Sequence, residues 1–163
     1  MADPADELWR YRLSLWQTVE VHAALLGERD GQALSGAVVK TWREGVVAQA
    51  FAVFIGAEKI KQPLRDPPDF QVLKGDTLHQ CEVTEVADRG DGLTPEKACA
   101  EIGRLAAKKA HERYDRAGVS VLILHVNADL ASAEAATLVA AAQPAKAAFA
   151  EVWLLWRGQW LAV

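Results

Sequence analysis

One apolar run near the end of the chain constrains the fold more than any other feature. Residues 119–126 read Val-Ser-Val-Leu-Ile-Leu-His-Val, which is nearly continuous in apolar side chains. A strand of this composition is buried on both faces, so it needs covering layers above and below it. The run therefore predicts a central strand in an α/β domain whose sheet carries helices on its faces.

Helical periodicity is found on both sides of this strand in the sequence. We expect helices over residues 6–26, 32–54, 94–117 and 130–148, the last one broken near Pro144. The third of these has the clearest start, because Thr94 can cap it and Pro95 suits its first position. Gly118 is expected to end it.

Shorter segments read as strands, because they alternate apolar and polar residues between turn-forming residues. We expect an edge strand within 59–68, strands at 69–73 and 78–86, and strands at 152–156 and 159–163. The second and third of these are joined by a turn at 74–76 and the last two by a tight turn at Arg157-Gly158. The order predicts one domain, residues 1–163, with a mixed sheet flanked by helices.

Charge and cysteine content exclude several classes of protein. The chain has 163 residues, with 18 Lys+Arg against 22 Asp+Glu, so a protein that binds polyanions by bulk positive charge is excluded. Its two cysteines, Cys81 and Cys99, are too few for a disulfide framework. The first residues lack the pattern of a signal peptide, and no apolar run reaches the roughly 18 residues that span a bilayer. We therefore expect a cytoplasmic protein with no membrane partner.

Two carboxylates are expected to meet on the sheet. Asp69 opens the first strand of the presumed hairpin, and Glu82 lies inside the second. Because side chains alternate along a strand, Glu82 shares a face with Gln80 and Thr84, while Glu85 points the other way. Two converging carboxylates in an apolar sheet are costly unless a cation lies between them. Mg²⁺ is a suitable cation, since it takes one or two carboxylates and keeps water in its other positions.

These residues resemble the motif of the PD-(D/E)XK nuclease superfamily. Pro68-Asp69 is similar to its first half and Glu82-Val83-Thr84 to its second. The resemblance implies a restriction-endonuclease-like mixed β-sheet with a core over residues 32–126, extended by an N-terminal helix and by a C-terminal helix plus strands. It also implies a Mg²⁺- or Mn²⁺-dependent nuclease that hydrolyses phosphodiester bonds of DNA or RNA.

The same resemblance implies roles for single residues. Asp69 and Glu82 would be catalytic metal ligands, and Glu44 is similar to a first-helix glutamate that assists the metal. Thr84 stands where the superfamily has a lysine, and some members carry that lysine on the following helix instead. Lys109 is the candidate here, because it falls on the apolar stripe of the 94–117 helix and Glu82 would be its natural partner. The helix also has a basic excess that would suit a phosphate backbone: Lys97, Arg104, Lys108, Arg113 and Arg116.

Each of these residues also has a simpler interpretation. Asp69 could cap a turn, Glu82 could lie exposed on an edge strand, and Glu44 could pair with Lys40 one helical turn away. Lys109 could extend from the rim of its helix into water.

Two alternative functions remain open. The chain could be a catalytically inactive nuclease-fold scaffold that binds protein or nucleic acid, or an unrelated α/β domain whose carboxylates lie far apart. The tryptophan-rich C-terminal strands are a candidate homodimer interface, although such tryptophans are more often core residues. His125 and Asn127, at the end of the buried strand, could border a pocket or simply form hydrogen bonds at the strand end.

Overall fold

The structure is a computed structural model that describes residues 36–61, 68–87, 92–112, 118–128 and 130–163. The predicted helix over residues 6–26 lies outside them. The helices are α2 (Gly36–Ile55), α3 (Pro95–His111), α4 (Ala135–Ala141) and the short 3-10 helix η3 (Gln143–Ala147). The strands are β1 (Lys59–Lys61), β2 (Phe70–Lys74), β3 (Thr77–Ala87), β4 (Val121–Asn127), β5 (Glu151–Trp156) and β6 (Gln159–Ala162).

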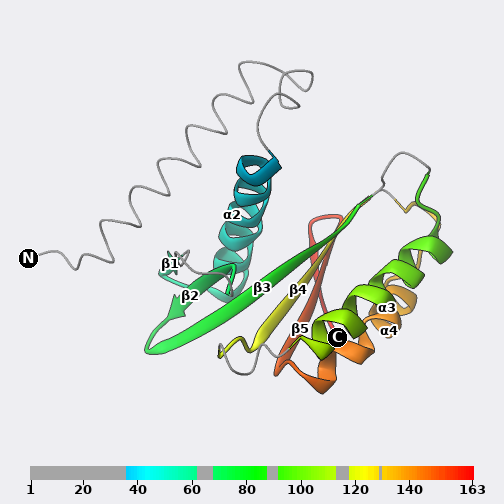
Figure 1. The fold of residues 1–163 in the computed structure, drawn as a ribbon. Coiled ribbons are helices and arrows are strands. Elements are labelled where there is room, and N and C mark those ends of the chain that lie inside the picture. Colours follow the sequence, from blue (N-terminus) through cyan, green and yellow to red (C-terminus); the bar gives the residue numbers. More distant parts are fainter. Residues whose placement is uncertain (1–35, 62–67, 88–91, 113–117, 129) are drawn as a thin grey trace, which may run out of the picture.

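All of these strands form one six-stranded sheet, in the order in which they occur along the chain. The three inner strands β3, β4 and β5 run parallel, and antiparallel pairs flank them on both sides. The buried run is β4, which pairs with β3 and β5 as a central strand should (Figure 1). The prediction of a mixed sheet flanked by helices is thus confirmed, while the specific restriction-endonuclease-like fold is not.

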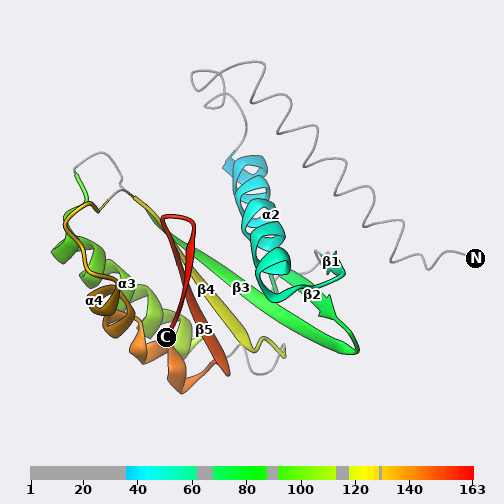
Figure 2. The ribbon, with the colours of Figure 1, turned by 180° about the vertical axis from the view of Figure 1, so that it is seen from behind.

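Helices cover both faces of the sheet. α2 lies on one face, and α3 and α4 lie on the other, as the front and back views show (Figures 1 and 2). The α2-side core includes Val47, Phe51, Phe70, Val72, Cys81, Val121 and Ile123. The α3-side core includes Ile102, Leu105, Leu122, Leu124, Val126, Leu138 and Trp156. None of the described helices has the length and apolar character needed to cross a bilayer.

Two tight turns occur where the sequence predicts them. The β2–β3 hairpin closes at Gly75, and Lys74 pairs with Thr77 in the sheet register. The β5–β6 hairpin closes through Arg157 and Gly158, with φ of 52° and 71°. Positive φ at both central residues is the type I′ geometry, which matches the twist of the flanking strands.

The sequence predicts the bounds of the described helices only in part. Thr94 caps α3 as expected, its Oγ1 accepting a hydrogen bond from the Lys97 N–H at 3.2 Å. α3 ends at His111 because Glu112 has an extended backbone, so the predicted end at residue 117 is wrong. The predicted helix over 130–148 is also too long. It is divided into α4 and η3, and Pro144 lies in the first turn of η3, just after its first residue Gln143, where its missing N–H costs nothing.

Candidate functional site

The β2–β3 hairpin places Asp69 beside the strand that carries Glu82. Phe70, the first residue of β2, pairs with Cys81. The N–H of Asp69 donates to the carbonyl of Cys81 at 3.0 Å, and its carboxylate accepts from the Val83 N–H. Asp69 therefore lies against residues 81–83 of β3. That its carboxylate converges with that of Glu82 stays a prediction.

Asp69 also has a local structural role. Its Oδ2 accepts a hydrogen bond from the Val83 N–H at 2.8 Å. This bond forms just beyond the point where the backbone pairing of β2 with β3 ends. Pro68 precedes it, and a proline has no N–H with which to continue the ladder. The Asp69 residue is only 6% exposed. A carboxylate this buried needs such donors and a nearby positive charge to remain ionised at low cost.

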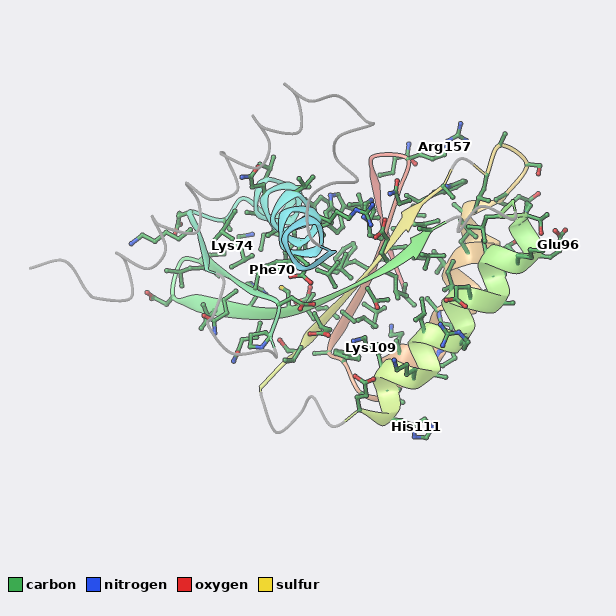
Figure 3. The ribbon with its side chains drawn as sticks, turned by 45° about the horizontal axis from the view of Figure 1, so that its top comes forward. Phe70, Lys74, Glu96, Lys109, His111 and Arg157 are labelled. Carbon is green, nitrogen blue, oxygen red and sulfur yellow. The ribbon has the colours of Figure 1, made fainter. Side chains whose placement is uncertain are left out.

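The positive charge in this region comes from α3. Figure 3 shows Lys109 on this helix. Its Nζ lies 2.7 Å from Glu82 Oε1, and the two side chains are 14% and 6% exposed. The predicted contact between Lys109 and Glu82 is thus confirmed, whereas extension of Lys109 from the rim into water is wrong. Lys109 Nζ also lies 3.7 Å from Glu112 Oε2 at the end of the helix. Removing one partner of a pair this buried typically costs 3–5 kcal/mol, because the other charge stays behind.

Glu44 enters from α2, the helix on the other face. It is buried and lies one turn before the fully buried Ala48. The side chain of Lys40 lies outside the described residues, so the alternative pairing is not described either. Across the described ranges, no three His, Cys, Asp or Glu side chains are grouped so as to hold one metal ion. A role for Glu44 as a third ligand would therefore require side chains to move, and it stays a prediction.

Nearby carboxylates also affect the protonation of the Cys81 thiol. Burial, then the carboxylate of Glu151, then that of Asp69 raise the pKa of Cys81 far above its usual value. Cys81 is consequently a neutral core thiol and not a nucleophile. Thr84, where the motif lysine would stand, is half-buried and carries no charge.

The basic excess predicted on α3 is partly neutralised. Arg104 forms two hydrogen bonds with Glu101, at 2.8 and 2.7 Å, and Lys108 lies 3.8 Å from Glu112. Arg113 and Arg116 lie outside the described residues. A DNA or RNA partner stays a prediction, and the described part of this helix adds little to it.

The C-terminal tryptophans pack within the molecule. Trp156 is buried in the α3-side core. On the other face, Trp153 and Trp160 lie 5.1 and 5.3 Å from the ring of Phe54, and Trp160 lies 5.4 Å from Phe51. These contacts fit the interpretation of such residues as core. A homodimer through these strands stays a prediction.

A polar region lies at the carboxyl end of β4, where the sequence pointed to His125 and Asn127 as possible pocket residues but not to Arg157. Glu85, on the face opposite to Glu82, accepts hydrogen bonds from Arg43 Nη1 and Asn127 Nδ2, both at 2.9 Å. His125 and Asn127 border a hollow there that also includes Arg157. The signal that could have found Arg157 is its position in the type I′ turn, where Asn, Asp or Gly is usual.

Comparisons with known proteins give little guidance on function. No protein-family model matches the chain, and no curated protein matches it. A solved structure from Pseudomonas aeruginosa is similar over 94% of this chain and 81% of its own, with 19% identity and a TM-score of 0.46. It is described as a protein of unknown function of the Monooxygenase Superfamily. A likeness this distant transfers neither a fold name nor an activity to this chain.

The predicted membership of the PD-(D/E)XK nucleases is corrected by these comparisons: no family model matches the chain, and the similar structure is described under a different superfamily. The assignment to that superfamily, the nuclease activity and the nuclease-fold scaffold are therefore not retained. The physical reason for the error is the shortness of the motif. An acid before one strand of a hairpin can serve a purely structural role, as Asp69 does by accepting from the Val83 N–H, and Thr84 lacks the charge that would make the pattern specific.

Proposed function

We propose that Asp69 and Glu82 form a binding site for a divalent cation, Mg²⁺ or Mn²⁺. The observation that carries this proposal is the Lys109 ammonium group 2.7 Å from Glu82. A buried ammonium group in contact with a carboxylate shows that this position favours positive charge. Asp69 lies beside residues 81–83 of β3, so a cation bound by Glu82 would have a second carboxylate nearby.

The donor set suits Mg²⁺ or Mn²⁺ better than Zn²⁺. The donors are carboxylate oxygens, and Cys81 of the same strand points to the other face. Structural Zn²⁺ usually takes four nitrogen or sulfur ligands, whereas Mg²⁺ is usually bound by one or two carboxylates and several waters. Two carboxylates, with no group of three such ligands in the described residues, are compatible with the coordination of Mg²⁺.

Lys109 would act as an internal counter-ion in this arrangement. Without a cation it balances Glu82, and with a cation in place it can keep Glu112 as its partner, since that carboxylate lies 3.7 Å away. Asp69 would remain fixed by the Val83 N–H and would bind through its second oxygen. A cation bound here would lower the pKa of a coordinated water and attract anionic ligands.

Competition between Lys109 and the cation gives a direct test. Thermal unfolding is measured during titration with MgCl₂ or MnCl₂, at ionic strength held constant with KCl, for wild type, Lys109→Met, Glu82→Gln and Glu85→Gln. Wild type should show saturable stabilisation, about 2.7 kcal/mol at a cation concentration one hundred times the Kd. Lys109→Met should start less stable and bind the cation more tightly, because its competitor is gone.

Glu85→Gln is the matched control, because Glu85 lies on the same strand but on the other face. It should bind the cation as wild type does, whereas Glu82→Gln should not. Equal stabilisation of all four proteins would mean diffuse surface binding and would overturn the proposal.

A further inference from the structure

Helix α2 carries a row of apolar residues on the side that faces away from the sheet. Its inner side packs into the α2-side core through Val47 and Phe51. Its outer side carries Val46, Ala50 and Val53, whose spacing of four and three residues places them in one row along a helix. Val46 is 47% exposed and Val53 83%. A helix that is apolar on both sides usually lies inside a protein, so this apolar row indicates that a further layer covers it.

The apolar row continues into an aromatic border. Phe54 is 44% exposed, although its ring lies 5.1 Å from that of Trp153 and 5.3 Å from that of Trp160. Residues 46–54 contain no charged side chain, and Gln49 is their one polar residue. Single exposed apolar residues are common on protein surfaces, whereas a continuous group of them marks a contact surface.

The chain segment that precedes α2 has a matching pattern in its sequence. Leu8, Tyr11 and Leu15 lie on the expected apolar face of residues 6–26, spaced by three and then four residues. The apolar row has the same spacing when it is followed backwards, from Val53 to Val46. Matching patterns in opposite chain directions bring the apolar residues of two antiparallel helices together, as in helical hairpins.

The length of the connection supports the same arrangement. Three pairs follow from the matched spacing: Leu8 with Val53, Tyr11 with Ala50, and Leu15 with Val46. The midpoint of this register falls between Asp30 and Gly31, within the mostly polar residues 27–35. These nine residues can readily span the roughly 8–10 Å between the axes of packed helices. As helices, residues 6–26 and α2 would both be about 30 Å long.

We propose that residues 6–26 of the same chain dock on the apolar row as a helix antiparallel to α2. This segment is joined to α2 by a short connection, so its effective concentration at the row exceeds that of any separate partner. Once docked, it forms a second helical layer on the α2 side of the sheet. The docking surface is distinct from the proposed cation site, because Glu82 contacts α3 on the other side of the sheet.

Engineered disulfides in the full chain test the register. The background is Cys99→Ser, because Cys99 is the more accessible native thiol and Cys81 is buried. Leu8→Cys combined with Val53→Cys should form a disulfide within one chain on mild oxidation, seen as a compact monomer on non-reducing electrophoresis. The matched control is Leu8→Cys with Val46→Cys, which lies about 10 Å further along α2. The first pair should form its disulfide roughly tenfold faster, because a disulfide requires Cα atoms within about 7 Å.

Limited proteolysis measures docking without any engineered bond. Trypsin cleavage after Arg10 and Arg12, followed by mass spectrometry, reports how often the segment leaves the row. Val53→Asp should accelerate this cleavage about tenfold or more, because docking would bury a carboxylate without a partner. Leu78→Asp is the matched control, since Leu78 is also an exposed apolar residue, at 45%, but lies in β3. It should be cleaved at the wild-type rate.

Three results would overturn the proposal. The first is equal disulfide formation by the two cysteine pairs, and the second is equal cleavage of Val53→Asp and wild type. The third is a disulfide that joins two chains, which would mean that the segment of a second copy covers the apolar row.

Discussion

At the scale of single residues, β3 forms an ion pair with a different helix on each of its faces. Glu82 pairs with Lys109 of α3, and Glu85, three positions later and facing the other way, pairs with Arg43 of α2. The two ion pairs differ in how much they contribute to stability. Arg43 is 50% exposed and Glu85 24%, so their pair contributes about 0–1 kcal/mol, whereas the pair of Lys109 is mostly desolvated.

The acid sensitivity of the fold should depend partly on His125. Its pKa in the folded protein is lowered from 6.5, mainly by burial, so the unfolded chain binds a proton more readily. Unfolding then takes up a proton, and stability is lost as pH falls below about 6.5. His125→Phe, which does not titrate, should lose less stability between pH 7 and pH 5 than wild type does. Urea unfolding at the two pH values measures this difference. If His125→Phe and wild type lose the same stability on acidification, burial of His125 does not control the response.

At the scale of elements, α3 shows what sequence patterns can and cannot locate. Its start was predictable because Thr94 and Pro95 are local signals that act within one turn. Its end was not, because no glycine or proline occurs between His111 and Gly118, so no local signal in the sequence marks a stop at Glu112. The alanine-rich stretch before Pro144 was overextended for a related reason, since alanine favours a helix but does not say where one begins.

Loss of the α3 cap should destabilise the protein by a predictable amount. Thr94→Ala removes the acceptor for the Lys97 N–H, which should lower the free energy of unfolding by about 1 kcal/mol. Thr94→Ser keeps an acceptor and should recover most of the loss. Urea denaturation of the three proteins measures the effect, and equal stability of the Ala and Ser variants would contradict it.

At the scale of the whole molecule, one strand serves both cores. Ile123 of β4 is fully buried in the α2-side core, and the adjacent Leu124 is fully buried in the α3-side core. If β4 leaves the sheet, the apolar residues of both cores are exposed to water. The single domain predicted from the sequence should therefore unfold in one cooperative transition.

Leu124→Ala tests this coupling. It should cost about 2–5 kcal/mol, because it leaves a cavity in the α3-side core. The loss should appear equally in signals from Trp153 and Trp160, which lie on the other face. Fluorescence of a variant that keeps only these two tryptophans should shift to a lower urea midpoint, matching the shift in circular dichroism. Two separate transitions would contradict a single cooperative unit.

The candidate sites also differ in how far the sequence could locate them. The pairing of Glu82 with Lys109 could be predicted from strand alternation and helical periodicity, because each rule acts within one element. At the end of β4, the sequence could name His125 and Asn127 as border residues of a hollow but not Arg157. The extent of the hollow depends on where β4 and β5 stop pairing, and that point is fixed by packing across the sheet and not by any local pattern.

The two edges of the sheet are its shortest strands, β1 with three residues and β6 with four. An edge this short offers another chain few backbone groups with which to pair, and Lys59 and Lys61 add charge to one of them. The long apolar strand β4 is enclosed between its neighbours and becomes available for intermolecular pairing only after the sheet opens. Aggregation of this protein should therefore follow its unfolding rate, so additives that slow unfolding will also extend its shelf life in solution.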